Sequence, residues 1–258
     1  MTRKYFFFDI DGTLIPSGYA DSRIPDSALN AIEQLKQKGH FVSIATGRAE
    51  ALAHQTRLDL GFENMVSDGG NGITIDGYIL EIEPIDHEAV NDLVDQCKEL
   101  GMPWALSPYN MDHRWAPDKS FYDYTHDTYI PTVVRKDLDP RNYPQILKAY
   151  VACKAGEEEK LPALKRLPWA RFHDTYIFVE PTSKAKGIKK IVDHFGGKYE
   201  DVVVFGDAMN DLSMFLDEWT CVAMGNACDE LKAKATYITT DVDKDGIYNA
   251  CKHFGWID

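Results

Sequence analysis

The first sixty residues alternate between continuous apolar runs and segments whose apolar residues recur at helical spacing. The runs Tyr5–Phe8 and Phe41–Ala45 have the pattern of strands that are buried on both faces of a sheet. One helix is predicted from Pro25, in its first turn, to a stop at Gly39, and another over Ala49–Leu58. The order strand, helix, strand, helix predicts a parallel sheet with right-handed crossovers.

The pattern changes after residue 64. Ser67–Gly72 is rich in turn residues, and Ile73–Glu83 alternates about Asp76-Gly77 like a hairpin. Ten of the chain's 12 prolines lie in the following hundred residues. We therefore expect residues 83–181 to form an inserted second domain of mixed α+β type. Its predicted helices are His87–Leu100 and Leu138–Lys148, and its predicted strands are Trp104–Leu106, Val151–Lys154 and Tyr176–Val179.

The α/β alternation then resumes. Strands are predicted at Val202–Phe205, Cys221–Met224 and Tyr237–Thr239, and helices at Lys186–Phe195, Asp211–Phe215 and Gly246–Phe254. The fold class expected is therefore α/β, with one central parallel sheet built from residues 1–82 and 182–258 and interrupted by the inserted domain.

Composition and charge limit the possible partners. With 28 Lys plus Arg against 41 Asp plus Glu, the formal net charge is −13. Such a chain repels nucleic acid and anionic lipid unless its basic residues cluster, so neither is an expected partner. No apolar run approaches the ~20 residues of a membrane span, and the N-terminus lacks the features of a signal peptide. We expect a cytoplasmic protein, monomeric or weakly dimeric, whose five cysteines are reduced.

The first candidate chemistry is Asp9-Ile10-Asp11-Gly12-Thr13, where the first buried strand ends. Strand alternation directs Asp9 and Asp11 to the same side, where two carboxylates repel each other unless a cation or a shared proton intervenes. A divalent ion would relieve that repulsion. By itself, an acidic strand end followed by glycine is also typical of a solvated turn.

Two more polar loops follow strands in the same way. Thr46-Gly47-Arg48 follows the second strand, and Gly206–Asp211, with Asp207 and Asn210, follows the third. Ligands in open α/β sheets bind at the carboxyl ends of the strands, so these loops are expected to share one site. An ammonium near the carboxylates would offset their repulsion, and Lys186, before Gly187, is the preferred candidate for it. Lys184, two residues earlier, is the alternative.

The motifs D-x-D-G-T, T-G-R, K-G and G-D-x-x-N-D, in this order, resemble the four signatures of the haloacid dehalogenase (HAD) superfamily of phosphohydrolases. The position and size of the inserted domain are similar to those of the C2B cap of Cof-type sugar phosphatases. The resemblance implies a Rossmann-like three-layer core around a central parallel sheet, with an α+β cap that acts as a lid over the substrate.

The resemblance also implies roles for the residues. Asp9 would be the nucleophile that forms an aspartyl-phosphate, and Asp11 the general acid and base. Mg²⁺ would be held by Asp9, by the backbone carbonyl of Asp11 and by Asp207, with Asp211 supporting them from outside the coordination sphere. The phosphoryl oxygens would be bound by side chains and amides of the four motifs, which are those of Ile10, Gly12, Thr46, Gly47, Arg48, Lys186 and Asn210.

The function expected is a Mg²⁺-dependent phosphatase that acts on a small phosphorylated metabolite, with a sugar phosphate as the preferred class. In the inserted domain, the segment Asn110–Trp115 is dense in groups that can bind sugars or anions. Three alternatives remain: a phosphomutase or phosphotransferase on sugar phosphates, a regulatory protein that binds a phosphorylated ligand without turnover, and a phospho-signalling receiver. The last disagrees with the length of the chain, because receivers are about half as long.

Overall fold

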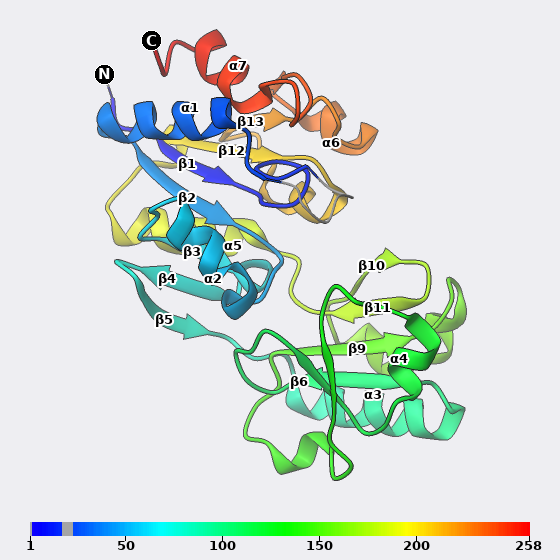
Figure 1. Cartoon of the computed structure of the whole chain (residues 1–258). Helices are drawn as coiled ribbons and strands as arrows, with labels where there is room; N and C mark the ends of the chain where they lie inside the picture. Colours follow the sequence, from blue (N-terminus) through cyan, green and yellow to red (C-terminus); the bar gives the residue numbers. More distant parts are fainter. Residues whose placement is uncertain (1, 17–22) are drawn as a thin grey trace. The chain divides into compact units, whose positions relative to one another are not determined.

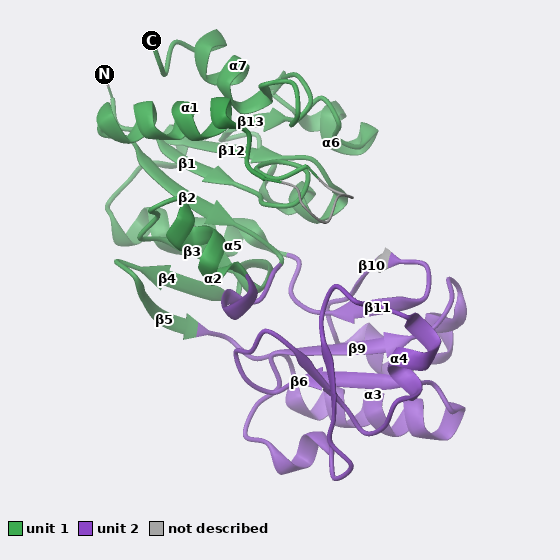
Figure 2. Ribbon diagram, viewed as in Figure 1, with its two compact units in different colours: residues 1–47, 53–81, 183–258 green, residues 48–52, 82–182 purple. Residues whose placement is uncertain are grey.

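A computed structural model describes residues 2–16 and 23–258 of the chain (Figure 1). It divides into two compact units (Figure 2). The core unit comprises Met1–Gly47, Ala53–Glu81 and Ser183–Asp258, and the insert unit comprises Arg48–Leu52 and Ile82–Thr182. The sequence placed residues 48–52 with the sheet domain, whereas in the structure this short segment packs with the insert.

The core unit contains an eight-stranded sheet in the order β14-β13-β12-β1-β2-β3-β4-β5. Its strands are β1 (Tyr5–Phe8), β2 (Phe41–Ala45), β3 (Met65–Ser67), β4 (Gly72–Ile75), β5 (Tyr78–Ile82), β12 (Val202–Gly206), β13 (Thr220–Ala223) and β14 (Tyr237–Ile238). The strands from β14 to β3 in that order run parallel, and β4 pairs antiparallel to β3. The predicted α/β fold with a central parallel sheet is confirmed.

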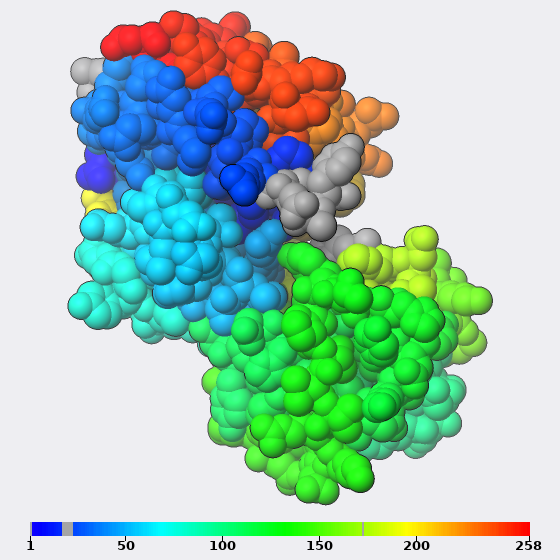
Figure 3. Space-filling model, viewed as in Figure 1, coloured from blue at the N-terminus to red at the C-terminus, as the bar shows by residue number. Residues whose placement is uncertain are grey.

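Helices cover both faces of this sheet, which gives three layers. They are α1 (Asp26–Gln37), α2 (Glu50–Asp59), α5 (Lys184–His194), α6 (Asp229–Lys234) and α7 (Gly246–His253). Alternate side chains of β1 enter opposite cores: Phe6 and Phe8 pack with residues of α1 and α7, and Phe7 packs with residues of α5. The helices α1 and α7 lie side by side although they come from opposite ends of the chain (Figures 1 and 3).

The insert unit has its own six-stranded sheet in the order β10-β11-β9-β6-β7-β8. The strands are β6 (Trp104–Ser107), β7 (Arg114–Ala116), β8 (Thr132–Val134), β9 (Lys148–Ala152), β10 (Ala170–His173) and β11 (Tyr176–Val179). Helix α3 (His87–Leu100) packs against one face, and α4 (Ser120–Thr125) contributes Phe121 to the core on the other face.

One element predicted in this unit is wrong. The sequence suggested a helix over Leu138–Lys148, but the structure has a single 3₁₀ turn at Pro140–Asn142, and β9 begins at Lys148. The prolines at 140 and 144 explain the difference, because proline lacks the N–H that a helix interior requires and restricts the residue before it.

All five cysteines are free thiols. Within residues 2–16 and 23–258, no helix has the length and the apolar character needed to cross a membrane.

Candidate active site

The central strand of the core sheet brings the candidate loops together. Strand β1 lies between β2 and β12, all three are parallel, and their carboxyl ends therefore share one edge of the sheet. The backbone N–H of Asp9, just past β1, donates to the carbonyl of Phe205 in β12 at 3.0 Å. This bond places Asp9 beside the loop that carries Asp207.

Three carboxylates and one ammonium gather there. Asp9, Asp207 and Asp211 each offer a carboxylate oxygen, and these oxygens lie within 4.8 Å of one another. The Lys184 Nζ atom is 2.6 Å from Asp9 Oδ1 and 2.5 Å from Asp211 Oδ1. Asp9, Asp211 and Lys184 are 3%, 0% and 1% exposed. Asp207 is half-buried. One ammonium does not balance the charge of these three carboxylates, which favours a further cation in the site.

The ammonium beside these carboxylates belongs to Lys184. The prediction that Lys186 occupies this position is wrong. Lys186 is exposed, and its Nζ atom donates to Asn71 Oδ1 at 3.4 Å. Residues two apart on a helix point about 200° apart, so only one of the two lysines can face the sheet. The buried face of α5 includes Ile188 and Ile191, and Lys184 lies four and seven residues before them. That helical phase was the available signal for Lys184.

Asp211 is fully engaged by the protein. Its Oδ2 atom accepts the backbone N–H groups of Asp207 and Ala208 at 2.9 and 3.1 Å, while Oδ1 accepts from Lys184. These contacts fix the loop after β12 and hold the lysine. The role expected of Asp211, to support the site from outside the coordination sphere of a metal, stays a prediction.

The first loop is packed tightly against Asp207. Gly12 has φ +88°, and a Cβ atom there would lie 2.1 Å from Asp207 Oδ2, so only glycine fits. The Thr13 hydroxyl donates to Asp207 Oδ1 at 3.0 Å. Asn226, which the sequence reasoning missed, donates from Nδ2 to the Gly12 carbonyl at 2.8 Å. Its position shortly after β13, at a fourth strand end, was the signal that could have found it.

The remaining predicted site residues fall into different places. Thr46 is buried in the core unit, and Asn210 is half-buried, with an Oδ1 atom that has no hydrogen-bond partner among the described residues. Asp11 is half-buried, whereas the Ile10 side chain belongs to the hydrophobic core, so only the backbone of Ile10 can serve a ligand. Gly47 closes its segment of the core unit, and Arg48 belongs to the insert unit.

Burial and mutual repulsion perturb the titration of the cluster. Burial, together with the Asp211 carboxylate, holds the pKa of Asp9 well above its usual range, although Lys184 acts in the opposite direction. Burial and Asp211 also raise the pKa of Asp207 to about 7. Burial favours neutral Lys184, but the carboxylates of Asp211 and Asp9 outweigh it and raise the pKa of the lysine. The lysine is therefore a permanent cation in the site.

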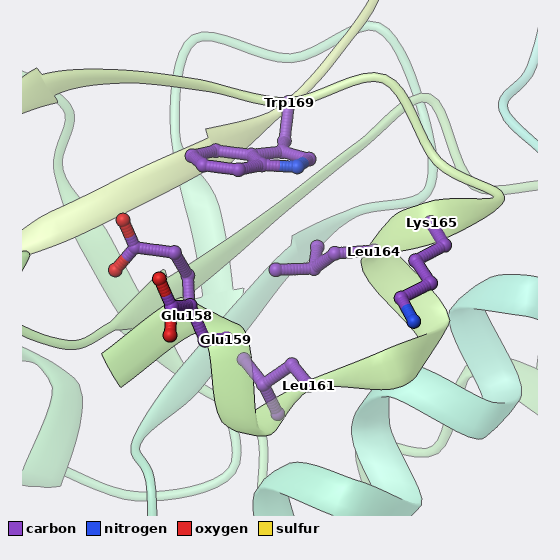
Figure 4. Close-up of a pocket in the computed structure, with 6 residues that line it drawn as sticks. All are labelled: Glu158, Glu159, Leu161, Leu164, Lys165 and Trp169. Carbon is purple, nitrogen blue, oxygen red and sulfur yellow. The ribbon is translucent and has the colours of Figure 1, made fainter. Parts of the chain in front are cut away.

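A separate hollow in the insert unit contains none of these residues. It has a volume of about 190 Å³, and Figure 4 shows Trp169 over Leu161 and Leu164, with Glu158 and Glu159 at one side. The Glu158 carboxylate already pairs with Arg171 at 2.9 Å. Ligand pockets commonly hold about 300 Å³ or more, so this hollow is smaller than a typical substrate site.

Comparison with known proteins agrees with this geometry. Residues 6–251 match the family model of haloacid dehalogenase-like hydrolases. The chain is 31% identical to the Bacillus subtilis (strain 168) protein YkrA, which is named as a candidate phosphatase, over 99% of both chains. It is 26% identical to YitU of the same organism, named 5-amino-6-(5-phospho-D-ribitylamino)uracil phosphatase, over 98% of both.

Solved structures give the same result. The chain superimposes on the HAD subclass IIB sugar phosphatase BT4131 with a TM-score of 0.79 and 32% identity, over 98% of this chain and 100% of that one. A hypothetical protein from Geobacillus kaustophilus gives a TM-score of 0.84 and 33% identity, over 99% and 100%. The family match over nearly the whole chain, together with these relatives, shows that the chain belongs to the haloacid dehalogenase-like hydrolases and is a phosphatase of that type.

Proposed function

We propose that the chain hydrolyses the phosphate monoester of a small metabolite, with a sugar phosphate as the preferred class, through an aspartyl-phosphate on Asp9 and with Mg²⁺ as cofactor. The observation that carries the proposal is the buried cluster of Asp9, Asp207 and Asp211 with Lys184 at the carboxyl edge of the sheet. The sugar preference is supported by the name of the subclass IIB sugar phosphatase that the chain resembles.

The residues present fit a magnesium ion. Mg²⁺ prefers hard oxygen ligands and is usually held by one or two carboxylates plus waters. Asp9 and Asp207 would supply these carboxylates, and the backbone carbonyl of Asp11 a third oxygen. The buried Oδ1 atom of Asn210, which has no partner among the described residues, is a further polar group that suits a bound ligand. When bound, the ion would offset negative charge on the carboxylates and the phosphoryl group.

The protein groups can then carry out two displacements. An Asp9 carboxylate oxygen forms a bond to phosphorus while the ester oxygen leaves, and Asp11 donates a proton to that oxygen. Asp11 next accepts a proton from water, the water oxygen attacks phosphorus, and the Asp9–phosphorus bond breaks to release inorganic phosphate. Lys184 keeps the Asp9 carboxylate in place, and Thr46 with Asn210 would bind phosphoryl oxygens.

A substrate screen tests the proposal. Purified protein would be incubated with Mg²⁺ and a panel of phosphorylated sugars, sugar alcohols, nucleotides and cofactors, and inorganic phosphate would be measured. Phosphate release from one or more small esters is the expected result. Isomerisation without phosphate release would instead indicate a phosphomutase, and tight binding without either reaction would indicate a regulatory protein.

Replacing Asp207 by Asn should weaken the binding of Mg²⁺ to the site. We expect the Mg²⁺ concentration for half-maximal activity to rise by about 100-fold, because one anionic oxygen ligand is lost, with a lower rate at saturation. Titration of activity with Mg²⁺ measures this, and Asp217→Asn, at an exposed aspartate, is the matched control. An unchanged Mg²⁺ dependence in Asp207→Asn would show that another carboxylate holds the ion.

Metal binding should also depend on pH. Because the pKa of Asp207 is raised to about 7 in the metal-free protein, protons compete with Mg²⁺ below pH 7. The apparent Mg²⁺ affinity should fall below pH 7, with a slope that approaches about tenfold per pH unit, and this effect of Asp207 should level off above pH 7. Calorimetric titrations between pH 5.5 and 8 measure this, and a constant affinity across that range would contradict the assignment of Asp207.

The raised pKa of Asp207 also predicts how the stability of the metal-free protein varies with pH. A carboxyl whose folded-state pKa is raised stabilises the fold fully below its unfolded pKa, and that contribution is lost as the pH rises through 7. Mg²⁺ should therefore raise the thermal unfolding midpoint more at pH 8 than at pH 5.5.

A further inference from the structure

The first turn of helix α2 (Glu50–Asp59) follows Ala49, whose side chain has no acceptor for the backbone N–H groups of that turn. Asn110, in the loop between β6 and β7, supplies one: its Oδ1 atom accepts from the backbone N–H of Ala51 at 2.9 Å. Its Nδ2 atom donates to the Glu50 carboxylate at 2.8 Å. An asparagine 59 residues away therefore caps the helix with both ends of its amide.

Two more contacts hold the same short segment within the insert unit. The Arg48 guanidinium lies 5.9 Å from the ring centroid of Tyr129, and Leu52 packs against the buried cluster that contains Phe121. Contacts with other residues of the insert are thus made along the whole of residues 48–52, which group with the insert in Figure 2.

Residues 48–52 follow closely after Thr46, a residue of the candidate catalytic site. Thr46 is fixed in the core unit, where its N–H donates to the Val66 carbonyl at 2.9 Å and its carbonyl accepts from Gly69 N–H at 3.1 Å. Only Gly47 separates Thr46 from Arg48. Glycine leaves the backbone largely unrestricted, so the conformation of this turn depends on how firmly each side is held.

We propose that Asn110 is a positioning residue: by capping α2 it fixes the turn that follows Thr46, and so holds the Thr46 hydroxyl where the phosphoryl group binds. This inference rests on the proposed function, since it assigns Thr46 to phosphoryl binding. Asn110 itself does not contact the reacting atoms. The competing explanation is that Asn110 is an ordinary helix cap, which would affect the unfolding midpoint and leave the reaction unchanged.

A donor–acceptor swap tests the inference, with p-nitrophenyl phosphate and Mg²⁺ as the assay. Asn110→Ala removes both hydrogen bonds, and Asn110→Asp sets a carboxylate against that of Glu50. In the double variant Asn110→Asp with Glu50→Gln, the new carboxylate can accept from Ala51 N–H and from the glutamine amide. Asp86→Ala is the matched control, because Asp86 caps α3 by accepting from Ala89 N–H at 2.9 Å.

We expect kcat to fall about tenfold in both single variants at Asn110, since small displacements of positioning groups are costly. KM should change less than kcat. The double variant should recover to within about threefold of wild type, a coupling that independent sites would not show. Hydrogen exchange of residues 46–52 should quicken in Asn110→Ala and not in Asp86→Ala, which should keep its kcat.

The outcomes separate the two proposals. If the kcat of Asn110→Ala stays within twofold of wild type while its unfolding midpoint drops as in Asp86→Ala, Asn110 is only a helix cap. Failure of the double variant to recover also overturns the positioning role. A wild-type protein that hydrolyses neither this ester nor any of the screened phosphates would instead refute the proposed function.

Discussion

Replacing Asp9 by Asn is expected to lower phosphate release by at least about 10⁴-fold. An amide oxygen cannot displace the ester oxygen at phosphorus, and loss of a covalent nucleophile is among the most costly single changes in an enzyme. The shape of the side chain is retained, and its Oδ1 atom can still accept from Lys184, which lies 2.6 Å away. Steady-state assays on the best ester from the substrate screen measure the effect, and a rate within tenfold of wild type would exclude Asp9 as the nucleophile.

The Asp9→Asn variant should lose its activity while it keeps its fold. Burial of the Asp9 carboxylate, together with the nearby carboxylates of Asp211 and Asp207, holds its pKa well above the usual range. Removing its charge relieves desolvation and repulsion, so the metal-free variant should unfold at the same temperature as wild type or higher. Circular dichroism and thermal unfolding check this. Asp243→Asn, at an exposed position, controls for the substitution itself and should retain both activity and stability.

The elements that could be predicted are those whose burial shows in their own sequence. The strands Tyr5–Phe8 and Val202–Gly206 are continuous apolar runs because both of their faces are covered. The short strand Thr132–Val134 is largely exposed and carries no such run, and α6 buries only Leu231. Their existence depends on partners elsewhere in the chain, so a local pattern could not show them.

The site could be predicted for a related reason. Chemistry in a parallel sheet lies at strand ends, so Asp9, Thr46 and Asp207 could be located from the strands alone. The choice between two lysines depended on the helical phase of α5, and the cap on α2 depended on a residue 59 positions away. Neither follows from motif spacing, because both are set by tertiary packing.

The second large effect on the rate is expected at Lys184, the lysine that the structure places beside Asp9. Lys184→Met should lower kcat by about 10³-fold or more, since it removes the buried ammonium that holds Asp9 and would offset charge near the phosphoryl group. Lys186→Met should change kcat by less than about fivefold, because Lys186 is exposed and its ammonium bonds to Asn71. The two substitutions are chemically identical and two residues apart, so each controls for the other.

Stability provides an independent measure of the same assignment. Lys184→Met leaves Asp9 and Asp211 buried without their shared cation, and breaking a buried pair by removing one partner costs roughly 3–5 kcal/mol. The metal-free variant should therefore lose that much unfolding free energy at pH 8. Acidification should restore part of it, because a protonated Asp9 carboxyl, whose pKa burial holds well above its usual range, no longer needs the ammonium. If Lys186→Met instead showed the larger losses of rate and stability, the ammonium that serves the site would be that of Lys186, and the packing of α5 described above would be wrong.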